Sequence, residues 1–135
     1  MPTRLNPYLG FRDNAREAMS FYQSVFGGKL DVMTFDQMAH DLAEKDKIMH
    51  AMLEAPNGLV LMGSDTPAGM TRNPGDNISV SLSGDNDAEL RGYWDKLAQG
   101  GQVTVPLEKA PWGDSFGMLV DKFGIPWMVN IAGAR

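Results

Sequence analysis

Asn6-Pro-Tyr-Leu-Gly-Phe11 is an alternating stretch that returns in the second half of the chain as Asn77-Ile-Ser-Val-Ser-Leu82. The offset between the copies is 71 residues (77 minus 6) at these stretches. It is 73 residues (100 minus 27) at the glycine pairs that follow, Gly27-Gly28 and Gly100-Gly101. A repeat of this length indicates two copies of a supersecondary module, because solenoid units are shorter.

Each copy continues with a predicted amphipathic helix. Asn14 with Glu17, and Asn86 with Glu89, have the spacing of a capping box at the two helix starts. Apolar residues follow at helical spacing, and the paired glycines end each pattern. The apolar positions are Ala15, Ala18, Met19, Tyr22, Val25 and Phe26 in the first helix, and Leu90, Tyr93, Trp94 and Leu97 in the second.

Three further strands are predicted in each copy. Within them, Ala51-Met-Leu-Glu54 returns as Gly117-Met-Leu-Val120 at an ungapped offset of 66 residues (117 minus 51). The predicted strands occupy residues 29–35, 48–55, 59–63, 102–105, 115–120 and 126–131. Each module is therefore predicted to be βαβββ, and the fold class is α+β.

The length of 135 residues predicts one compact domain, residues 1–135. We expect a first module at 1–63, a linker at 64–76 and a second module at 77–135. The linker is rich in Pro, Gly and Asn, which indicates irregular backbone. Segment 36–47 is too polar for a strand and is predicted to be a loop or a short exposed helix.

Composition excludes several classes of function. The net charge of −5 and the pI near 4.8 argue against a nucleic-acid partner, because nucleic-acid binding requires a basic face. No apolar run approaches the roughly 18 residues of a membrane span, and the N-terminus lacks the apolar core of a secretory leader. The chain has no cysteine, which excludes disulfides, thiolate ligands and a cysteine nucleophile and fits a reducing cytoplasm.

The first strand of each module has a polar side that we expect to face a cleft. The positions on this side are Asn6, Tyr8 and Gly10 in the first copy, and Asn77, Ser79 and Ser81 in the second. The opposite side, which includes Leu5 and Ile78, is expected to pack on the helix. The cleft-facing parity is shared by Met52, Met62, Met118 and Met128. Such methionines form either an adaptable pocket lining or ordinary core.

The doubled module and several motifs resemble the vicinal oxygen chelate superfamily, which includes glyoxalase I, extradiol dioxygenases, and bleomycin- and fosfomycin-resistance proteins. The motifs are most similar to its PhnB-like branch: Pro7-Tyr8-Leu9-x-Phe11, Asn14-Ala15-x-Glu17-Ala18, Trp112-Gly113-x-x-Phe116-Gly117 and Asp121-x-Phe123-Gly124-x-Pro126-Trp127-Met128-Val129-Asn130. The resemblance covers essentially the whole chain. It implies two half-barrels that form one curved eight-stranded mixed sheet, with the helices on its outer face.

Metal-dependent members of this superfamily bind their ion through the first and last strands of both modules, typically with His, Gln and Glu. Carried onto this sequence, the resemblance places Asn6 and Asn77 on the first strands and Met62 and Met128 on the last. Neutral amides and thioethers are poor ligands for Mg²⁺, Mn²⁺, Zn²⁺ and Fe²⁺. We therefore expect no metal ion and no other cofactor.

His50 is the candidate catalytic residue, because a strand histidine facing a cleft can act as an acid or base. The alternative is an ordinary half-exposed strand histidine. His40 is expected to be solvated, and Asp65 to cap a turn. Trp112 and Asp114 either contact a cationic or aromatic ligand at the cleft mouth or close the core edge and fix the turn. The predicted ligand-binding cleft comprises Asn6, Tyr8, His50, Met52, Met62, Asn77, Ser79, Trp112, Asp114, Phe116, Met118 and Met128.

Three functions remain open at this stage. The first is metal-free binding of a small molecule, as the resemblance to bleomycin-resistance proteins implies. The second is a lyase, isomerase or transferase in which His50 moves a proton and Asn6 or Asn77 polarises a carbonyl. The third is a dimeric interaction module, because the resemblance implies a homodimer, with the cleft either within one chain or shared by two subunits. Neither nucleic acid nor a membrane is an expected partner.

Overall fold

The structure is a computed structural model, and it describes residues 3, 5–34, 47–66, 73–75 and 77–133. The chain divides into two compact units, Met1–Pro74 and Gly75–Arg135. Several predictions fall outside the described residues: those for His40, for residues 36–46 of the polar segment, and for residues 67–72 and 76 of the linker.

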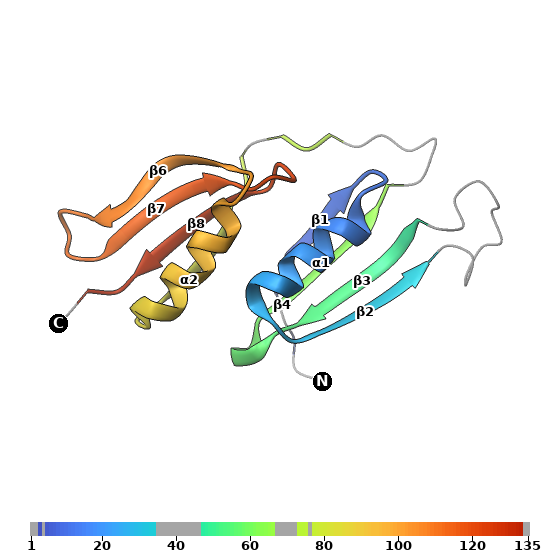
Figure 1. Cartoon of the computed structure of the whole chain (residues 1–135), viewed down its shortest axis with the longest axis horizontal. Helices are drawn as coiled ribbons and strands as arrows, with labels where there is room; N and C mark the ends of the chain where they lie inside the picture. The colour runs from blue at the N-terminus through green and yellow to red at the C-terminus, as the bar shows by residue number, and fades with distance from the viewer. Residues whose placement is uncertain (1–2, 4, 35–46, 67–72, 76, 134–135) are drawn as a thin grey trace. The chain divides into compact units, whose positions relative to one another are not determined.

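Each unit has one strand, one helix and then three strands, as the repeat predicts (Figure 1). The first unit consists of β1 (Tyr8–Phe11), α1 (Ala15–Phe26), β2 (Lys29–Thr34), β3 (Ile48–Glu54), the 3₁₀ helix η2 (Pro56–Gly58) and β4 (Val60–Asp65). The second consists of β5 (Val80–Gly84), α2 (Asp87–Ala98), β6 (Gln102–Lys109), β7 (Ser115–Val120) and β8 (Pro126–Ile131). Strand β4 thus continues past residue 63, where the first module is predicted to end, and β6 continues past residue 105.

The two units share one sheet topology, with strand orders β1-β4-β3-β2 and β5-β8-β7-β6. The pairs β1–β4 and β5–β8 are parallel, and the other neighbours are antiparallel. Each helix packs on one face of its own sheet (Figure 1). The predicted α+β fold of two βαβββ modules is confirmed. Its eight strands are paired as two four-stranded sheets, one in each unit, where the resemblance implies a single sheet.

The predicted helix stripes form much of the core. All six apolar positions predicted for α1 are buried. In α2 the buried positions are Leu90, Trp94 and Leu97. Tyr93 is only half-buried, and its hydroxyl donates a hydrogen bond to Glu89 Oε1 at 2.7 Å.

Leu5 and Ile78 do not pack on the helices, so that prediction is wrong. Their exposed fractions are 101% and 76%. The reason is register: β1 begins at Tyr8 and β5 at Val80, so both residues precede the paired strands.

The glycine pairs connect each helix to the strand that follows it. Gly27 and Gly100 have φ values of +76° and +75°, a backbone conformation that side chains disfavour. At Gly28 and Gly101 a Cβ atom would collide with the carbonyl oxygens of Glu54 and Val120. Two different requirements therefore explain why both positions of each pair are glycine.

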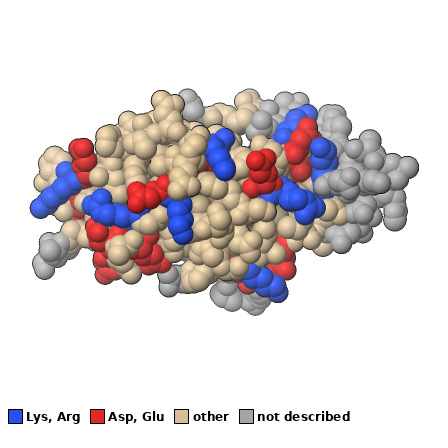
Figure 2. All heavy atoms as spheres, in the orientation of Figure 1, with Lys and Arg blue, Asp and Glu red and all other residues tan. Residues whose placement is uncertain are grey.

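Charged side chains are mixed on the surface that Figure 2 shows. Lysine and arginine side chains lie among aspartate and glutamate side chains, and neither sign forms a continuous patch on this face. Such interspersed charge is typical of a solvated protein surface. Among the described residues, neither helix has the length and apolar character needed to cross a bilayer.

Candidate functional site

The candidate residues of the first unit lie on the face of its sheet that turns away from α1, which we call the first helix-free face. Burial alternates along the strands: Ala51 and Leu53 are buried, whereas His50 and Met52 between and beside them are not. The strand register places on this face Tyr8, Gly10, Lys29, Asp31, Met33, His50, Met52, Glu54, Val60, Met62 and Ser64. Tyr8 pairs with Met62, and Met62 pairs with Met52, so these three form a row across the sheet.

Tyr8 and His50 meet above the intervening strand β4. The Tyr8 hydroxyl lies 3.4 Å from His50 Nδ1, and the ring centroids are 5.8 Å apart. A separation of 3.4 Å is long for a hydrogen bond between oxygen and nitrogen. Across β4, Tyr8 is paired with Met62 and Gly10 with Ser64, so the Tyr8 side chain reaches His50 along a diagonal. The pair offers one hydroxyl and one imidazole beside the row of methionines, and the exposed carboxylate of Asp31 lies next to Met52 on the same face.

The second unit repeats this arrangement on the face of its sheet that turns away from α2, the second helix-free face. The register places there Ser81, Ser83, Gln102, Val105, Glu108, Phe116, Met118, Val120, Pro126, Met128 and Asn130. Met118 pairs directly with Met128, as Met52 pairs with Met62 in the first unit. Each module therefore carries one methionine pair at the centre of its helix-free face.

Trp112 and Asp114 lie in the turn before β7 and differ in their exposure to solvent. Trp112 is 66% exposed, with its ring 6.2 Å from the ring of Phe116 between centroids. Asp114 is buried, with its carboxylate accepting from Gly133 N at 2.9 Å and from Asn130 Nδ2 at 3.1 Å. Asp114 therefore ties the turn to β8 and reaches the helix-free face through Asn130.

The structure does not place the predicted first-strand residues Asn6, Asn77 and Ser79 in strands. They precede β1 and β5 in the chain. The first-strand residues that pair with Met62 and Met128 are instead Tyr8 and Ser81. Ser81 lies on the predicted polar side of its strand, but neither Ser81 nor Asn130 is among the predicted cleft residues. Ser81 follows Tyr8 at an offset of 73 (81 minus 8), the offset of the glycine pairs, and this match is the signal that identifies it.

The residues at these positions do not fit the metal ion that the superfamily implies. Tyr8 and Met62 in one unit, and Ser81 and Met128 in the other, supply neither a carboxylate nor an imidazole. Oxygen-seeking divalent cations prefer carboxylates, and zinc and iron prefer imidazole or carboxylate. In the part of the chain that the structure describes, no group of three His, Cys, Asp or Glu side chains is placed to hold an ion.

The family follows from a sequence model that matches residues 4–129, the model of the Glyoxalase/Bleomycin resistance protein/Dioxygenase superfamily. The chain belongs to this superfamily. Among solved structures, the PA1353 protein of Pseudomonas aeruginosa is 39% identical, with a TM-score of 0.86 and coverage of 97% of this chain and 98% of that one.

One further structure supports the PhnB-like resemblance, and one further relative is similar in sequence. The PhnB protein of Bacillus cereus is 27% identical, with a TM-score of 0.73 over 96% of this chain and 100% of that one. The YjdN protein of Escherichia coli is 29% identical over 94% of both chains. This superfamily member is therefore similar to the PhnB-like proteins in both sequence and fold.

Proposed function

We propose that this chain is a metal-free small-molecule-binding protein of the glyoxalase/bleomycin-resistance superfamily, and that its ligand contacts the helix-free faces. The observation that carries the proposal is the methionine pair at the centre of each face, Met52 with Met62 and Met118 with Met128. All four side chains are only partly buried. Thioethers are flexible and polarizable, so such a surface adapts to apolar and aromatic ligands of varied shape.

The polar groups beside the methionines would fix the orientation of the ligand. Tyr8 and His50 supply a hydroxyl and an imidazole on the first face, and Ser81 supplies a hydroxyl on the second. A few hydrogen-bonding groups on a mainly apolar lining are the usual composition of a small-molecule site. Binding without a metal fits the absence of anionic and imidazole donors at the metal positions of the superfamily.

Methionine-methyl NMR of the full chain tests this proposal. With ¹³C-methyl methionine labelling, a library of small aromatic and heterocyclic compounds should yield ligands that shift Met52, Met62, Met118 or Met128. Met19 is fully buried on the inner side of α1 and is the internal control. The proposal is wrong if no compound shifts these four methyls, or if Met19 shifts as much as they do.

The contact between Tyr8 and His50 favours a second candidate function, an enzyme that moves a proton on a small substrate. The Tyr8 hydroxyl lies beside one nitrogen of the His50 imidazole, so the second nitrogen is available for acid or base work. His50→Gln should then lower any turnover detected with a panel of small carbonyl compounds by about 100-fold or more. Tyr8→Phe should lower it less. Unchanged turnover in the His50 variant would exclude this mechanism.

A further inference from the structure

Asn130 is a polar residue on the second helix-free face, and the NH₂ group of its carboxamide is hydrogen-bonded to a buried carboxylate. Its neighbours Val129 and Ile131 are buried, so the alternation of β8 places Asn130 on the same face as Met128. Its Nδ2 donates to Asp114 Oδ2 at 3.1 Å. The other oxygen of Asp114 accepts from the backbone N–H of Gly133 at 2.9 Å, so the carboxylate is itself fixed.

This contact determines which end of the Asn130 carboxamide faces outward. A carboxylate only accepts hydrogen bonds, so the carboxamide must present its NH₂ group to Asp114. The carbonyl Oδ1 then points away from Asp114. Within the described residues Oδ1 accepts no hydrogen bond, so this oxygen is an acceptor of fixed direction.

Aromatic rings lie beside this acceptor. Phe116 is the direct cross-strand partner of Asn130, and the Trp112 ring lies 6.2 Å from the Phe116 ring between centroids. The first unit has no equivalent of the Asn130–Asp114 pair. The corresponding positions, at an offset of 66, are Ser64 (130 minus 66) and Ile48 (114 minus 66). The second face therefore differs from the first in having a directed acceptor next to an aromatic surface.

We propose that Asn130, oriented by the buried Asp114, selects ligands that carry an N–H or O–H donor on a flat ring, with Phe116 and Trp112 contacting the ring. This inference rests on the proposed function, because it assigns a ligand class to the second helix-free face. Asn130 contacts the ligand, whereas Asp114 acts through Asn130 as a positioning residue.

Indole and 1-methylindole are a matched pair of probes, because they share a ring and only indole has an N–H donor. Titration of the ¹⁵N-labelled full chain with each probe should shift resonances of the second face, including the Trp112 side chain. A hydrogen bond to Asn130 predicts about 3- to 10-fold tighter binding of indole than of 1-methylindole. Asn130→Leu should remove this preference while leaving the 1-methylindole affinity within about 2-fold.

Asp114→Asn gives a sharper test. Its carbonyl can still accept from Gly133, and its new NH₂ group then faces Asn130 in place of an oxygen. Two NH₂ groups repel, so the Asn130 carboxamide should rotate by half a turn and present its NH₂ group to the ligand. The preference for indole should disappear, and the Asn130 side-chain NH₂ resonances should move. Asp95→Asn, which removes an exposed charge on α2, is the matched control and should preserve the preference.

The outcomes separate this inference from the proposed function. Equal affinities for the two probes in the natural chain, or an indole preference that survives Asn130→Leu, would overturn the role of Asn130 and leave small-molecule binding intact. Failure of both probes to shift the second face would also overturn it, whereas the methionine-methyl screen decides the proposed function independently. If Asp114→Asn does not fold, Asn130→Leu decides the outcome alone.

Discussion

Single buried carboxylates fix the strand ends of both units by accepting hydrogen bonds from groups distant in the sequence or in the adjoining turn. Asp65 accepts from Ala15 N and from Ile48 N, both at 2.9 Å, and thereby joins the end of β4 to the starts of α1 and β3. Asp114 makes the reciprocal connection, from the turn before β7 to the end of β8. Asp121 accepts from Phe123 N, Ile125 N and Trp127 Nε1 in the turn between β7 and β8. Each of these buried carboxylates accepts at least two hydrogen bonds, because burying a charge without such partners costs much free energy.

Asp65→Ala should destabilise the chain by about 2–4 kcal/mol, because it leaves two buried backbone N–H groups without an acceptor. The free energy of unfolding from urea titration measures this loss. Asp31→Ala is the control in the same unit, because its side chain is 59% exposed and pairs with Lys29 only at 3.8 Å. Its effect should stay within about 0.5 kcal/mol. Similar losses in the two variants would show that Asp65 is not a structural tie.

Tyr93 should make stability depend on pH in the alkaline range. Burial, the hydrogen bond to Glu89 and the charge of Glu89 raise the pKa of Tyr93 from 10.0 to about 12. The folded chain then keeps a proton that the unfolded chain has lost, so this contribution is complete below pH 10 and is lost as the pH rises from 10 to about 12.

Melting temperatures between pH 9 and pH 12 test the expectation for Tyr93. The natural chain should lose more stability over the upper part of this range than Tyr93→Phe. Tyr8→Phe, which alters an exposed tyrosine, is the control and should follow the natural chain. Parallel curves for the natural chain and Tyr93→Phe would contradict the expectation.

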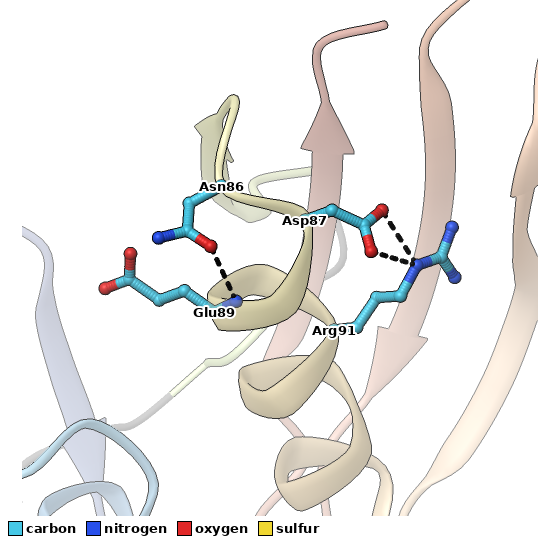
Figure 3. A network of polar contacts seen from close by, with 4 residues as sticks. All are labelled: Asn86, Asp87, Glu89 and Arg91. Carbon is cyan, nitrogen blue, oxygen red and sulfur yellow. Dashed lines mark hydrogen bonds and ion pairs between the residues drawn. The ribbon is translucent and has the colours of Figure 1, made fainter.

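The two helices begin in different ways, although their sequences predict the same cap. Asn86 has extended backbone (φ −88°, ψ 94°), and its side chain accepts from Glu89 N at 3.1 Å (Figure 3). Asn14 has different dihedral angles (φ −128°, ψ 19°) and makes no side-chain cap, so the predicted capping box at α1 is wrong. The carboxylate of Asp65 accepts from the first N–H of that helix instead. A negative charge also interacts favourably with a helix N-terminus.

The matched substitutions Asn86→Ala and Asn14→Ala should therefore have unequal effects. Asn86→Ala removes the cap of α2 and should lower the free energy of unfolding by about 1 kcal/mol. Asn14→Ala should lower it by less than about 0.5 kcal/mol. Urea unfolding of the two variants beside the natural chain measures the difference. Equal costs would mean that Asn14 caps α1 in solution.

The whole molecule consists of two copies of one module that have diverged at equivalent surface positions. Both keep the methionine pair, while the first has His50 where the second has Phe116, and the first has Ser64 where the second has Asn130. The common pair supports a general affinity for apolar ligands in our proposal. In our proposals, these differences place proton chemistry on the first face and ligand selection on the second.

The resemblance to this superfamily also predicts a homodimer. Light scattering from the full chain should give a mass near twice 14.8 kDa. Dilution should shift this value only when the concentration falls below the dissociation constant. A mass of 14.8 kDa across the accessible concentration range would contradict the expectation.

The sequence by itself determined the repeat, the helix stripes and the outward parity of Met52, Met62, Met118 and Met128, because these depend on the spacing of neighbouring residues. Only the tertiary structure decided the pairing of Tyr8 with Met62 in place of Asn6, since strand register depends on which residues meet across the sheet. It also decided the partners of Asp65 and Asn130, which lie 50 and 16 residues away along the chain. Local periodicity carries no information about such distant contacts, so the positions of the polar groups on the helix-free faces emerge only when the strands are paired.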